Sequence, residues 1–262
     1  MKVLIVTGAS RGLGRSIALA FVKQFCSFTP TAQETWKICL LARDQAALQV
    51  TQQFIHEALP SNQNITVNCH GIDLGQIDDL SDRIESFLAE LSSESVSELY
   101  FINNAGSLGP IGPCRNTNLQ TMQSNFDFNI TSACWLSARF VQWANETMNC
   151  PKTVIVNISS LVAIQAFPSL GMYSAGKAAR DMFHAALAQE EEDVLVLNYA
   201  PGPLETDMTE QIRLAPLLDS SLRPHYQKQL VDPDDSAAKL VDILFYQKFK
   251  SGQHVDYYDA LE

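Results

Sequence analysis

Basic residues are scarce in this sequence. Lysine and arginine together number 18 of 262 residues, against 29 aspartates and glutamates, so the formal net charge is −11. We find no basic patch among these few cations and therefore expect neither nucleic acid nor an anionic membrane as a partner. The acidic excess mainly favours solubility.

Cysteines are also few, and they are scattered along the chain without the CxxC spacing of a metal site. We therefore predict no metal site, with free thiols that pack as small apolar side chains. No signal peptide precedes the first apolar run, which favours a reduced, cytoplasmic setting. The six cysteines are Cys26, Cys39, Cys69, Cys114, Cys134 and Cys150. The four Asn-x-Ser/Thr triplets, at Asn64, Asn129, Asn145 and Asn157, are then not expected to carry sugars.

The chain has no linker, internal repeat or low-complexity tract, and 46% of its residues are hydrophobic. One domain spanning residues 1–262 is the natural expectation. Helical stretches alternate with short apolar runs, a pattern typical of a doubly wound, mostly parallel sheet of the Rossmann type with helices on both faces. The expected strands lie near Lys2, Trp36, Ile65, Leu99, Thr153 and Val194, with a seventh near His254.

A glycine-punctuated turn follows the first apolar run. Residues 2–6 resemble a buried parallel strand, Thr7 to Gly14 form the turn, and good helix formers with an apolar face follow to Val22. Glycines let a backbone approach a pyrophosphate, and a helix start supplies free N–H groups. The spacing G-x-x-x-G-x-G differs from the G-x-G-x-x-G Rossmann pattern, and an ordinary turn is the alternative. The strand before it and the helix after it favour a dinucleotide-binding turn.

The second expected strand bears on the choice of cofactor. It spans residues 36–42 and ends at Arg43, where an NAD-binding fold usually carries an acid for the ribose 2′-hydroxyl. An arginine instead accommodates a 2′-phosphate, and Arg11 in the turn offers a second guanidinium. Asp44 follows directly and leaves some ambiguity. We favour NADPH/NADP⁺ over NADH.

Ser160, Tyr173 and Lys177 are the candidate catalytic residues. Ser160 ends an apolar strand, and ligands in open α/β sheets bind beyond the carboxyl ends of strands. Tyr173 and Lys177 are four residues apart and so share one helix face. Tyr246 and Lys250 have the same spacing but no serine-bearing strand or glycine turn beside them, so we interpret Tyr246 as a helix-face or packing residue.

These residue types suit the reduction of a carbonyl by hydride, which leaves an alkoxide that must be protonated. A free tyrosine, with a pKa of about 10, holds its proton too tightly for neutral operation. We expect a nearby Lys177 ammonium to lower the pKa of Tyr173, so that it serves as the proton donor. Ser160 would donate to the substrate oxygen. The alternative for Ser160 is a cap on the next backbone turn.

Asn129 lies within a long helical stretch from Leu119 to Asn145. Asparagine is a poor interior helix former because it competes for backbone hydrogen bonds, so a kink or a local water site is expected there. It either anchors a water that returns protons through Lys177 or is simply tolerated. The helix around residues 126–143 is apolar on more than one face, which suits a dimer interface or packing within the domain.

These motifs together resemble the short-chain dehydrogenase/reductase family over nearly the whole chain. The matching pieces are the turn Gly8 to Gly14, Asp73-Leu74, Asn103 to Gly106, Asn129, Ser160, Tyr173, Lys177 and Pro201-Gly202. The resemblance implies a catalytic tetrad of Asn129, Ser160, Tyr173 and Lys177. The cofactor-binding residues expected from the motifs and the resemblance are Gly8, Ser10, Arg11, Gly12, Leu13, Gly14, Arg43, Asp44, Asp73, Leu74, Asn104, Ala105, Gly106, Tyr173, Lys177, Pro201, Gly202, Leu204, Thr206, Asp207 and Met208.

Longer strings, 101–109, 173–182, 197–204 and the tail 250–259, resemble the pterin-reducing members of that family. This implies NADPH-dependent reduction of the side-chain ketones of a pterin, the last steps toward tetrahydrobiopterin, in a cytosolic homodimer. By analogy Asp256 would anchor the pterin, because a carboxylate can accept from the ring amine and the adjacent ring N–H. The expected substrate contacts are Ser160, Tyr173, Gly202 and Asp256, with possible ring walls at Leu108, Leu161, Gln165, Phe167 and Met208.

Two segments and two other functions complete the prediction. Residues 206–224 are expected to form a lid over the cofactor. The connection from Phe25 to Thr35 is longer than usual and has no assigned role. A general NADPH-dependent carbonyl or diketone reductase is an alternative, and a non-catalytic NADP(H)-sensing regulator is a further one, since fold does not determine function.

Overall fold

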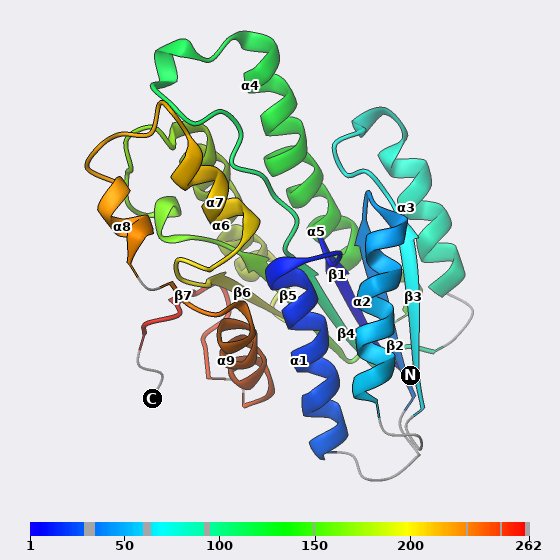
Figure 1. Cartoon of the computed structure of the whole chain (residues 1–262). Coiled ribbons are helices and arrows are strands. Elements are labelled where there is room, and N and C mark those ends of the chain that lie inside the picture. Colours follow the sequence, from blue (N-terminus) through cyan, green and yellow to red (C-terminus); the bar gives the residue numbers. More distant parts are fainter. Residues whose placement is uncertain are drawn as a thin grey trace.

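Seven parallel strands form a single sheet in this computed structural model, which describes residues 1–28, 35–59, 64–91, 95–148, 150–228, 230–246 and 248–259 (Figure 1). The strands are β1 (Lys2–Thr7), β2 (Trp36–Ala42), β3 (Ile65–Gly71), β4 (Glu98–Asn103), β5 (Lys152–Ile158), β6 (Val194–Ala200) and β7 (His254–Asp256). Their spatial order is β3-β2-β1-β4-β5-β6-β7, and every neighbouring pair is parallel. The predicted seven-stranded, doubly wound sheet is confirmed.

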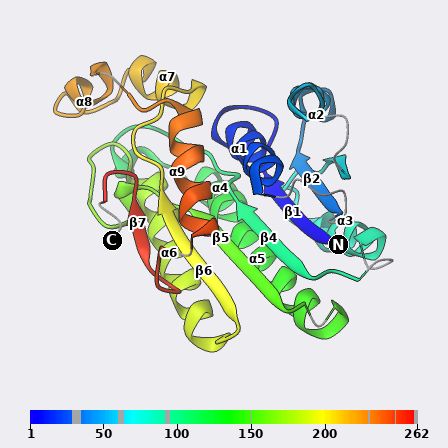
Figure 2. The same cartoon turned by 90° about the horizontal axis from the view of Figure 1, so that it is seen from below.

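Helices cover both faces of the sheet (Figure 2). One face packs against α1 (Gly12–Phe28), α2 (Gln45–Ala58) and α9 (Pro233–Phe245). The other packs against α3 (Ile77–Leu91), α5 (Ser132–Trp143) and α6 (Gly171–Glu190). The central strands are buried on both sides, which explains why their sequences are almost continuously apolar rather than alternating.

The long helix predicted from Leu119 to Asn145 forms, with an irregular turn inside it. It consists of α4 (Leu119–Phe126), a π-helical turn η2 (Asp127–Thr131), α5, and a second π-helical turn η3 (Ala144–Met148). Asn129 lies in the first π turn, so the expected departure from regular helix occurs at the asparagine. Single π turns inside α-helices are frequently found at functional sites.

The segment expected to be a lid forms two short helices, α7 (Asp207–Leu214) and α8 (Arg223–Gln227). They lie beyond the carboxyl end of the sheet, on the side of β6 (Figure 1). An apolar cluster separate from the two faces of the sheet holds them, and its members include Leu108, Val162, Leu170, Ile212 and Leu222. The lid therefore rests on residues of the β4 and β5 loops.

Two further observations concern the chain as a whole. The unexplained Phe25–Thr35 connection begins as the last turn of α1, and residues 29–34 of it lie outside the described residues. Across the described ranges, no helix is both long and apolar enough to cross a membrane.

Candidate active site

A cavity of about 1960 Å³ opens at the carboxyl ends of the central strands. The strand order switches between β1 and β4, because β2 and β3 lie on one side of β1 and β4 to β7 follow on the other. Ligands in open α/β folds bind in the crevice at such a switch point. Every cofactor-binding residue predicted from the sequence lines this cavity, as do Ser160 and Asp256. Asn129 does not line this cavity and instead borders a gap, too small for a water molecule, beside Tyr173, Gly176, Lys177 and Arg180. Gln165 is exposed and does not line the main cavity, so its assignment as a ring wall was wrong.

The glycine turn has a backbone that other residues would not allow. Gly8 and Gly12 have φ values of 65° and 53°, in the left-handed region that favours glycine. A Cβ at Gly14 would lie 2.3 Å from the Gly8 carbonyl oxygen, so the first turn of α1 packs directly on the loop. A bare backbone at a helix N-terminus, open to a cavity, fits the pyrophosphate of a dinucleotide.

The end of β4 is tied to this turn through Thr7. The Thr7 hydroxyl accepts hydrogen bonds from the backbone N–H groups of Asn104 and Ala105, each at 2.9 Å, and Asn104 Nδ2 donates to the Thr7 carbonyl at 2.8 Å. These bonds join the two loops that line the centre of the crevice. They hold Asn104 and Ala105 against the turn before any ligand binds.

Three arginines line the end of the cavity near β2, and they differ in their polar contacts. Arg43 is exposed and has no hydrogen-bond or ion-pair partner among the described residues. Arg11 pairs with Asp207 at 2.8 Å, which links the glycine turn to α7. Arg15, which the sequence analysis did not select, also lines the cavity and donates to the Ser10 carbonyl and the Thr51 hydroxyl. Of these three arginines, Arg43 alone has no polar partner in the part of the chain that the structure describes.

The acid that follows Arg43 has a structural role. Asp44 is the N-cap of α2, and its carboxylate accepts a hydrogen bond from the Ala47 backbone N–H at 3.0 Å. An N-cap aspartate satisfies one of the free donors at a helix start. The carboxylate is thus committed to the helix, which reduces the ambiguity that Asp44 introduced at this position.

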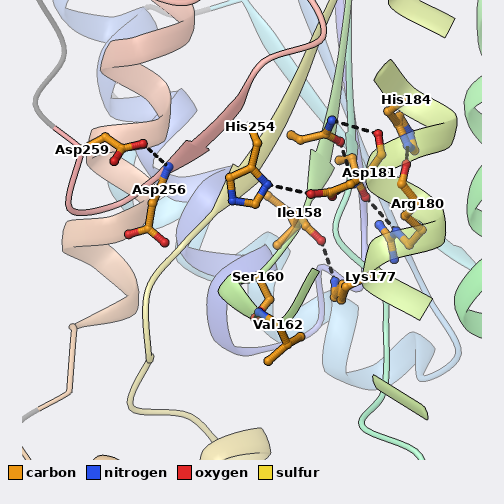
Figure 3. A network of polar contacts seen from close by, with 12 residues as sticks. Ile158, Ser160, Val162, Lys177, Arg180, Asp181, His184, His254, Asp256 and Asp259 are labelled. Carbon is orange, nitrogen blue, oxygen red and sulfur yellow. Dashed lines mark hydrogen bonds and ion pairs between the residues drawn. The ribbon is translucent and has the colours of Figure 1, made fainter. Parts of the chain in front are cut away.

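Ser160, Tyr173 and Lys177 come together at the carboxyl end of β5. The Ser160 hydroxyl caps the turn η4 (Leu161–Ala163) by accepting from the Val162 N–H at 3.4 Å. Ser160 also lies near enough to Tyr173 to lower its pKa. The cap that was the alternative for Ser160 is therefore present, and its donation to a substrate oxygen stays a prediction. Lys177 Nζ lies 5.7 Å from the centre of the Tyr173 ring and donates to the Ile158 carbonyl at 2.5 Å (Figure 3).

The pKa values of Tyr173 and Lys177 differ from the expectation. Burial raises the pKa of Tyr173 to about 12, against smaller opposing effects of Ser160 and Arg180. Burial, together with repulsion from Arg180, lowers the pKa of Lys177 well below its ordinary value. The prediction that Lys177 lowers the pKa of Tyr173 is therefore wrong for the protein alone, because desolvation of both groups exceeds their mutual attraction.

Arg180 is a buried residue that the sequence analysis missed. Its guanidinium is fully buried and donates to the Asn103 carbonyl at 2.5 Å, the Ala105 carbonyl at 2.9 Å and Asn157 Oδ1 at 2.7 Å. It thus joins α6, one turn below Lys177, to the ends of β4 and β5. Its only advance signal was its place three residues after Lys177, which is weak evidence for a buried cation.

Asn129 clamps the loop after β4 from the π turn. Its Oδ1 accepts from the Ser107 backbone N–H at 2.8 Å, and its Nδ2 donates to the Ser107 hydroxyl at 3.2 Å. A side chain in a regular α-helix would project at a different angle, because the π turn adds a residue to the ring of the hydrogen bond. The asparagine thus acts on the cofactor-side loop through Ser107.

Asp256 lies at the end of β7 and lines the cavity. Its Oδ1 accepts from the Tyr258 backbone N–H at 2.9 Å, while the described residues offer no partner to its Oδ2. Leu108, Leu161, Phe167 and Met208 also line the cavity, as predicted. Tyr226 of α8 does so too, and sequence reasoning missed it because no motif connects it to Tyr173.

The second Tyr-x-x-x-Lys pair lies away from this site. Tyr246 is 56% exposed at the end of α9, and neither Tyr246 nor Lys250 lines the cavity. Tyr246 is the C-cap of α9, and its interpretation as a helix-face or packing residue stays a prediction. In the described part of the chain, no cluster of three or more His, Cys, Asp or Glu side chains is placed to hold a metal ion.

A model of the short chain dehydrogenase family matches residues 2–216. The chain belongs to this family. Sepiapterin reductase of Rattus norvegicus is 36% identical over 98% of this chain and 96% of its own length. The benzil reductase of Bacillus subtilis, which forms (S)-benzoin, is 27% identical over 93% of each chain. Among solved structures, the KRED1-Pglu enzyme superposes with a TM-score of 0.78 at 22% identity, over 97% of this chain and all of the other, and shares the fold.

Membership of the short-chain dehydrogenase family makes this protein an oxidoreductase, a class that works with nicotinamide cofactors. The match covers the glycine turn, the Ser160–Tyr173–Lys177 group and the first part of the lid. It ends before β7, so Asp256 and the tail are covered only by the alignments to individual relatives.

Proposed function

We propose that this enzyme reduces the side-chain carbonyls of a pterin with NADPH, with Tyr173 as the proton donor, in the biosynthesis of tetrahydrobiopterin. The observation that carries the proposal is the carboxylate of Asp256 in the same cavity as Ser160, Tyr173 and Lys177, in a chain 36% identical to a sepiapterin reductase over nearly its full length. We further propose a homodimer in the cytoplasm. The six free thiols agree with a reducing compartment.

The residues present suit a dinucleotide with a 2′-phosphate. The turn Gly8–Gly14 would hold the pyrophosphate at the N-terminus of α1. Arg43 would pair with the 2′-phosphate, since it has no partner among the described residues and Asp44 is engaged in capping α2. Asp73 and Leu74 would border the adenine, and the lid residues 204–208 the nicotinamide. When bound, the cofactor supplies the hydride.

The side chains of α6 and β5 would handle the proton. Tyr173, with its pKa raised to about 12, is protonated throughout the neutral range and can donate its proton to the alkoxide oxygen. Ser160, which lines the same cavity, would donate to the same oxygen as charge develops there. Lys177 would bind the ribose of the nicotinamide, and Asn129 would keep the loop at Ser107 in place.

Asp256 would orient the substrate from the opposite wall. Its free Oδ2 and the second lone pair of Oδ1 can accept from the amine and the ring N–H of the pterin. Apolar and aromatic side chains around it, among them Leu108, Phe167 and Met208, would pack against the flat ring. The side-chain ketone would then face Tyr173.

The test is steady-state NADPH oxidation with sepiapterin and with diacetyl, a diketone without a pterin ring, for wild type and Asp256→Ala. We expect a preference for sepiapterin, in kcat/KM, that falls about 100-fold in the variant, because a charge-assisted bidentate contact contributes roughly 3 kcal/mol. Comparable rates with both substrates, unaffected by the substitution, would contradict the proposal.

A second candidate is a general NADPH-dependent reductase of diketones. It is favoured by the similarity to the benzil reductase of Bacillus subtilis, whose named substrate has two adjacent carbonyls and no pterin. The same experiment separates the two functions, because a diketone reductase would use diacetyl efficiently and would not depend on Asp256.

A further inference from the structure

Strand β7 is a short edge strand whose two faces meet different neighbours. It pairs in parallel with β6 alone, through Asn198–His254, Tyr199–Val255 and Ala200–Asp256. Side chains alternate along a strand, so His254 and Asp256 share one face. Val255 is fully buried on the other face, in the core beneath α1 and α9. The face that carries Asp256 therefore also carries His254, toward α6.

His254 contacts α6 through an ion pair. Its Nδ1 lies 2.6 Å from Asp181 Oδ2, and the two side chains are only 19% and 13% exposed (Figure 3). Asp181 follows Lys177 by four residues and Tyr173 by eight, so all three share one face of α6. Among the described residues, this is the one hydrogen bond or ion pair between α6 and β7.

Asp181 is itself held in place from the sheet. Its Oδ1 accepts from Asn157 Nδ2 at 3.0 Å, and Asn157 Oδ1 in turn accepts from Arg180 Nε at 2.7 Å. Arg180 continues to the carbonyls of Asn103 and Ala105. A continuous series of polar contacts thus runs from the loop after β4, across β5 and α6, to His254 on β7.

We propose that His254 is a positioning residue, whose contact with Asp181 fixes Asp256 relative to the Tyr173–Lys177 face of α6. The inference rests on the proposed function, because it gives Asp256 the task of holding the substrate. Asp256 ends a three-residue strand that is hydrogen-bonded on one side only. The pairing with β6, the burial of Val255 and the bonds from Lys239 to the Tyr257 and Asp259 carbonyls hold β7 from the β6 and α9 side. The contact of His254 with Asp181 ties the strand directly to the helix that carries the proton donor.

The chemistry of asparagine and glutamine allows a matched test. Asparagine places its amide nitrogen near the position of histidine Nδ1, and glutamine near that of Nε2. His254→Asn therefore keeps a donor toward Asp181, whereas His254→Gln moves the donor to the Nε2 position, which is buried and has no partner. Both substitutions are polar and similar in size, so they differ mainly in this contact.

Kinetics with sepiapterin and with diacetyl would be measured for wild type, both His254 variants, Asp256→Ala and the double variant His254→Gln/Asp256→Ala. We expect His254→Gln to raise KM for sepiapterin about 10-fold, with kcat and the diacetyl reaction within about 2-fold of wild type. His254→Asn should restore KM to within about 3-fold of wild type. In the Asp256→Ala background, His254→Gln should have no further effect, because the two residues act through one interaction.

Ser251→Ala serves as the control for a general loosening of the strand. Its hydroxyl accepts from the Val196 N–H and donates to the Val194 carbonyl, so its hydrogen bonds tie the turn before β7 to β6 rather than to α6. Melting temperatures of all variants would show that each is folded. We expect Ser251→Ala to lower the melting temperature while leaving KM for sepiapterin unchanged.

The outcomes separate this inference from the proposed function. Wild type without a preference for sepiapterin would refute the proposed function and, with it, a role for His254 in serving Asp256. If the preference holds, three results would each overturn the inference alone. These are an unchanged KM in His254→Gln, an equal loss with both substrates, or effects of His254→Gln and Asp256→Ala that simply add.

Discussion

The pKa values of Tyr173 and Lys177 are shifted more by burial than by their charged neighbours. Sequence reasoning paired a lysine ammonium with a tyrosine and expected the pKa of the tyrosine to fall. In the structure Lys177 is buried and Tyr173 partly buried, and the fully buried Arg180 guanidinium lies close by. Desolvation disfavours both charged forms, so the pKa of Tyr173 rises and that of Lys177 falls. Tyr173 therefore keeps its proton in the neutral range, as its proposed role as proton donor requires.

Removing that proton should abolish most of the activity. We expect Tyr173→Phe to lower kcat by roughly 10²–10⁴-fold, the range that general acid catalysis contributes, with little change in melting temperature because the ring stays. The measurement is NADPH oxidation with sepiapterin. Tyr246→Phe makes the same change in the second Tyr-x-x-x-Lys pair and should leave kcat unchanged. Full activity in Tyr173→Phe would exclude Tyr173 as the proton donor.

At the scale of elements, the site depends on irregular or short pieces attached to regular ones. The π turn directs Asn129 to the loop at Ser107, and the three-residue β7 brings His254 to α6. Neither piece has a strong local sequence pattern. Each is stabilised by polar contacts with a neighbouring element, so these contacts should also contribute to the stability of the fold.

The His254–Asp181 pair should make the stability depend on pH. The hydrogen bond with Asp181 raises the pKa of His254 above its ordinary value of 6.5, and the charges of Asp256 and Asp259 act in the same direction. A pKa raised on folding means that the folded state holds the proton more tightly. The stabilisation is therefore fully present below 6.5 and is lost as the pH rises through the folded-state pKa.

Urea unfolding of wild type and His254→Gln at a series of pH values would test this pH dependence. The series would run from about one pH unit below to about two pH units above the ordinary histidine pKa. We expect the difference in the free energy of unfolding to be largest at the acidic end and to shrink as the pH rises. Asp181→Asn, which removes the opposing charge, should reduce the pH dependence of the wild type. A difference that grows with pH would show that the sign is wrong.

At the scale of the whole molecule, the cavity is assembled from distant parts of the chain. The glycine turn lies near the N-terminus, and Arg43 follows β2. Ser160 follows β5, Tyr173 and Lys177 lie on α6, and the segment expected to be a lid follows β6. Arg11 and Asp207 already bridge the turn and α7 at 2.8 Å. A cofactor bound here would contact most of these parts at once and should stabilise the entire fold.

Thermal unfolding should therefore reveal the cofactor and its phosphate. NADPH at about 100 times its Kd should add about 2.7 kcal/mol, which corresponds to a rise in melting temperature of roughly 5–10 °C. We expect a smaller rise with NADH at equal concentration, and Arg43→Ala should reduce the effect of NADPH to that of NADH. Arg83→Ala, an exposed arginine on α3 away from the cavity, is the control. Equal shifts with both cofactors in wild type would contradict the choice of NADPH.

A structural feature can be predicted from the sequence when a short segment of the chain encodes it. The strands, the glycine turn, the long helix with its irregularity at Asn129 and the Tyr173–Lys177 pair are all encoded within short segments. Hydrophobic period and fixed spacing are local properties, so a reader of the sequence can recognise them. The predicted cofactor-binding residues line one cavity because parallel strands bring their following loops to the same edge.

By itself, the sequence determined the doubly wound fold, the family and the residues at the strand ends. Only the tertiary structure decided what those residues contact and how they titrate. Asp44 caps a helix, Arg11 pairs with Asp207 across 196 positions, and His254 pairs with Asp181 across 73. Tyr226 and Arg180 enter the site without any motif. The physical reason is that the contacts and the burial of a side chain depend on which distant segments pack together. A local sequence pattern carries no information about that packing.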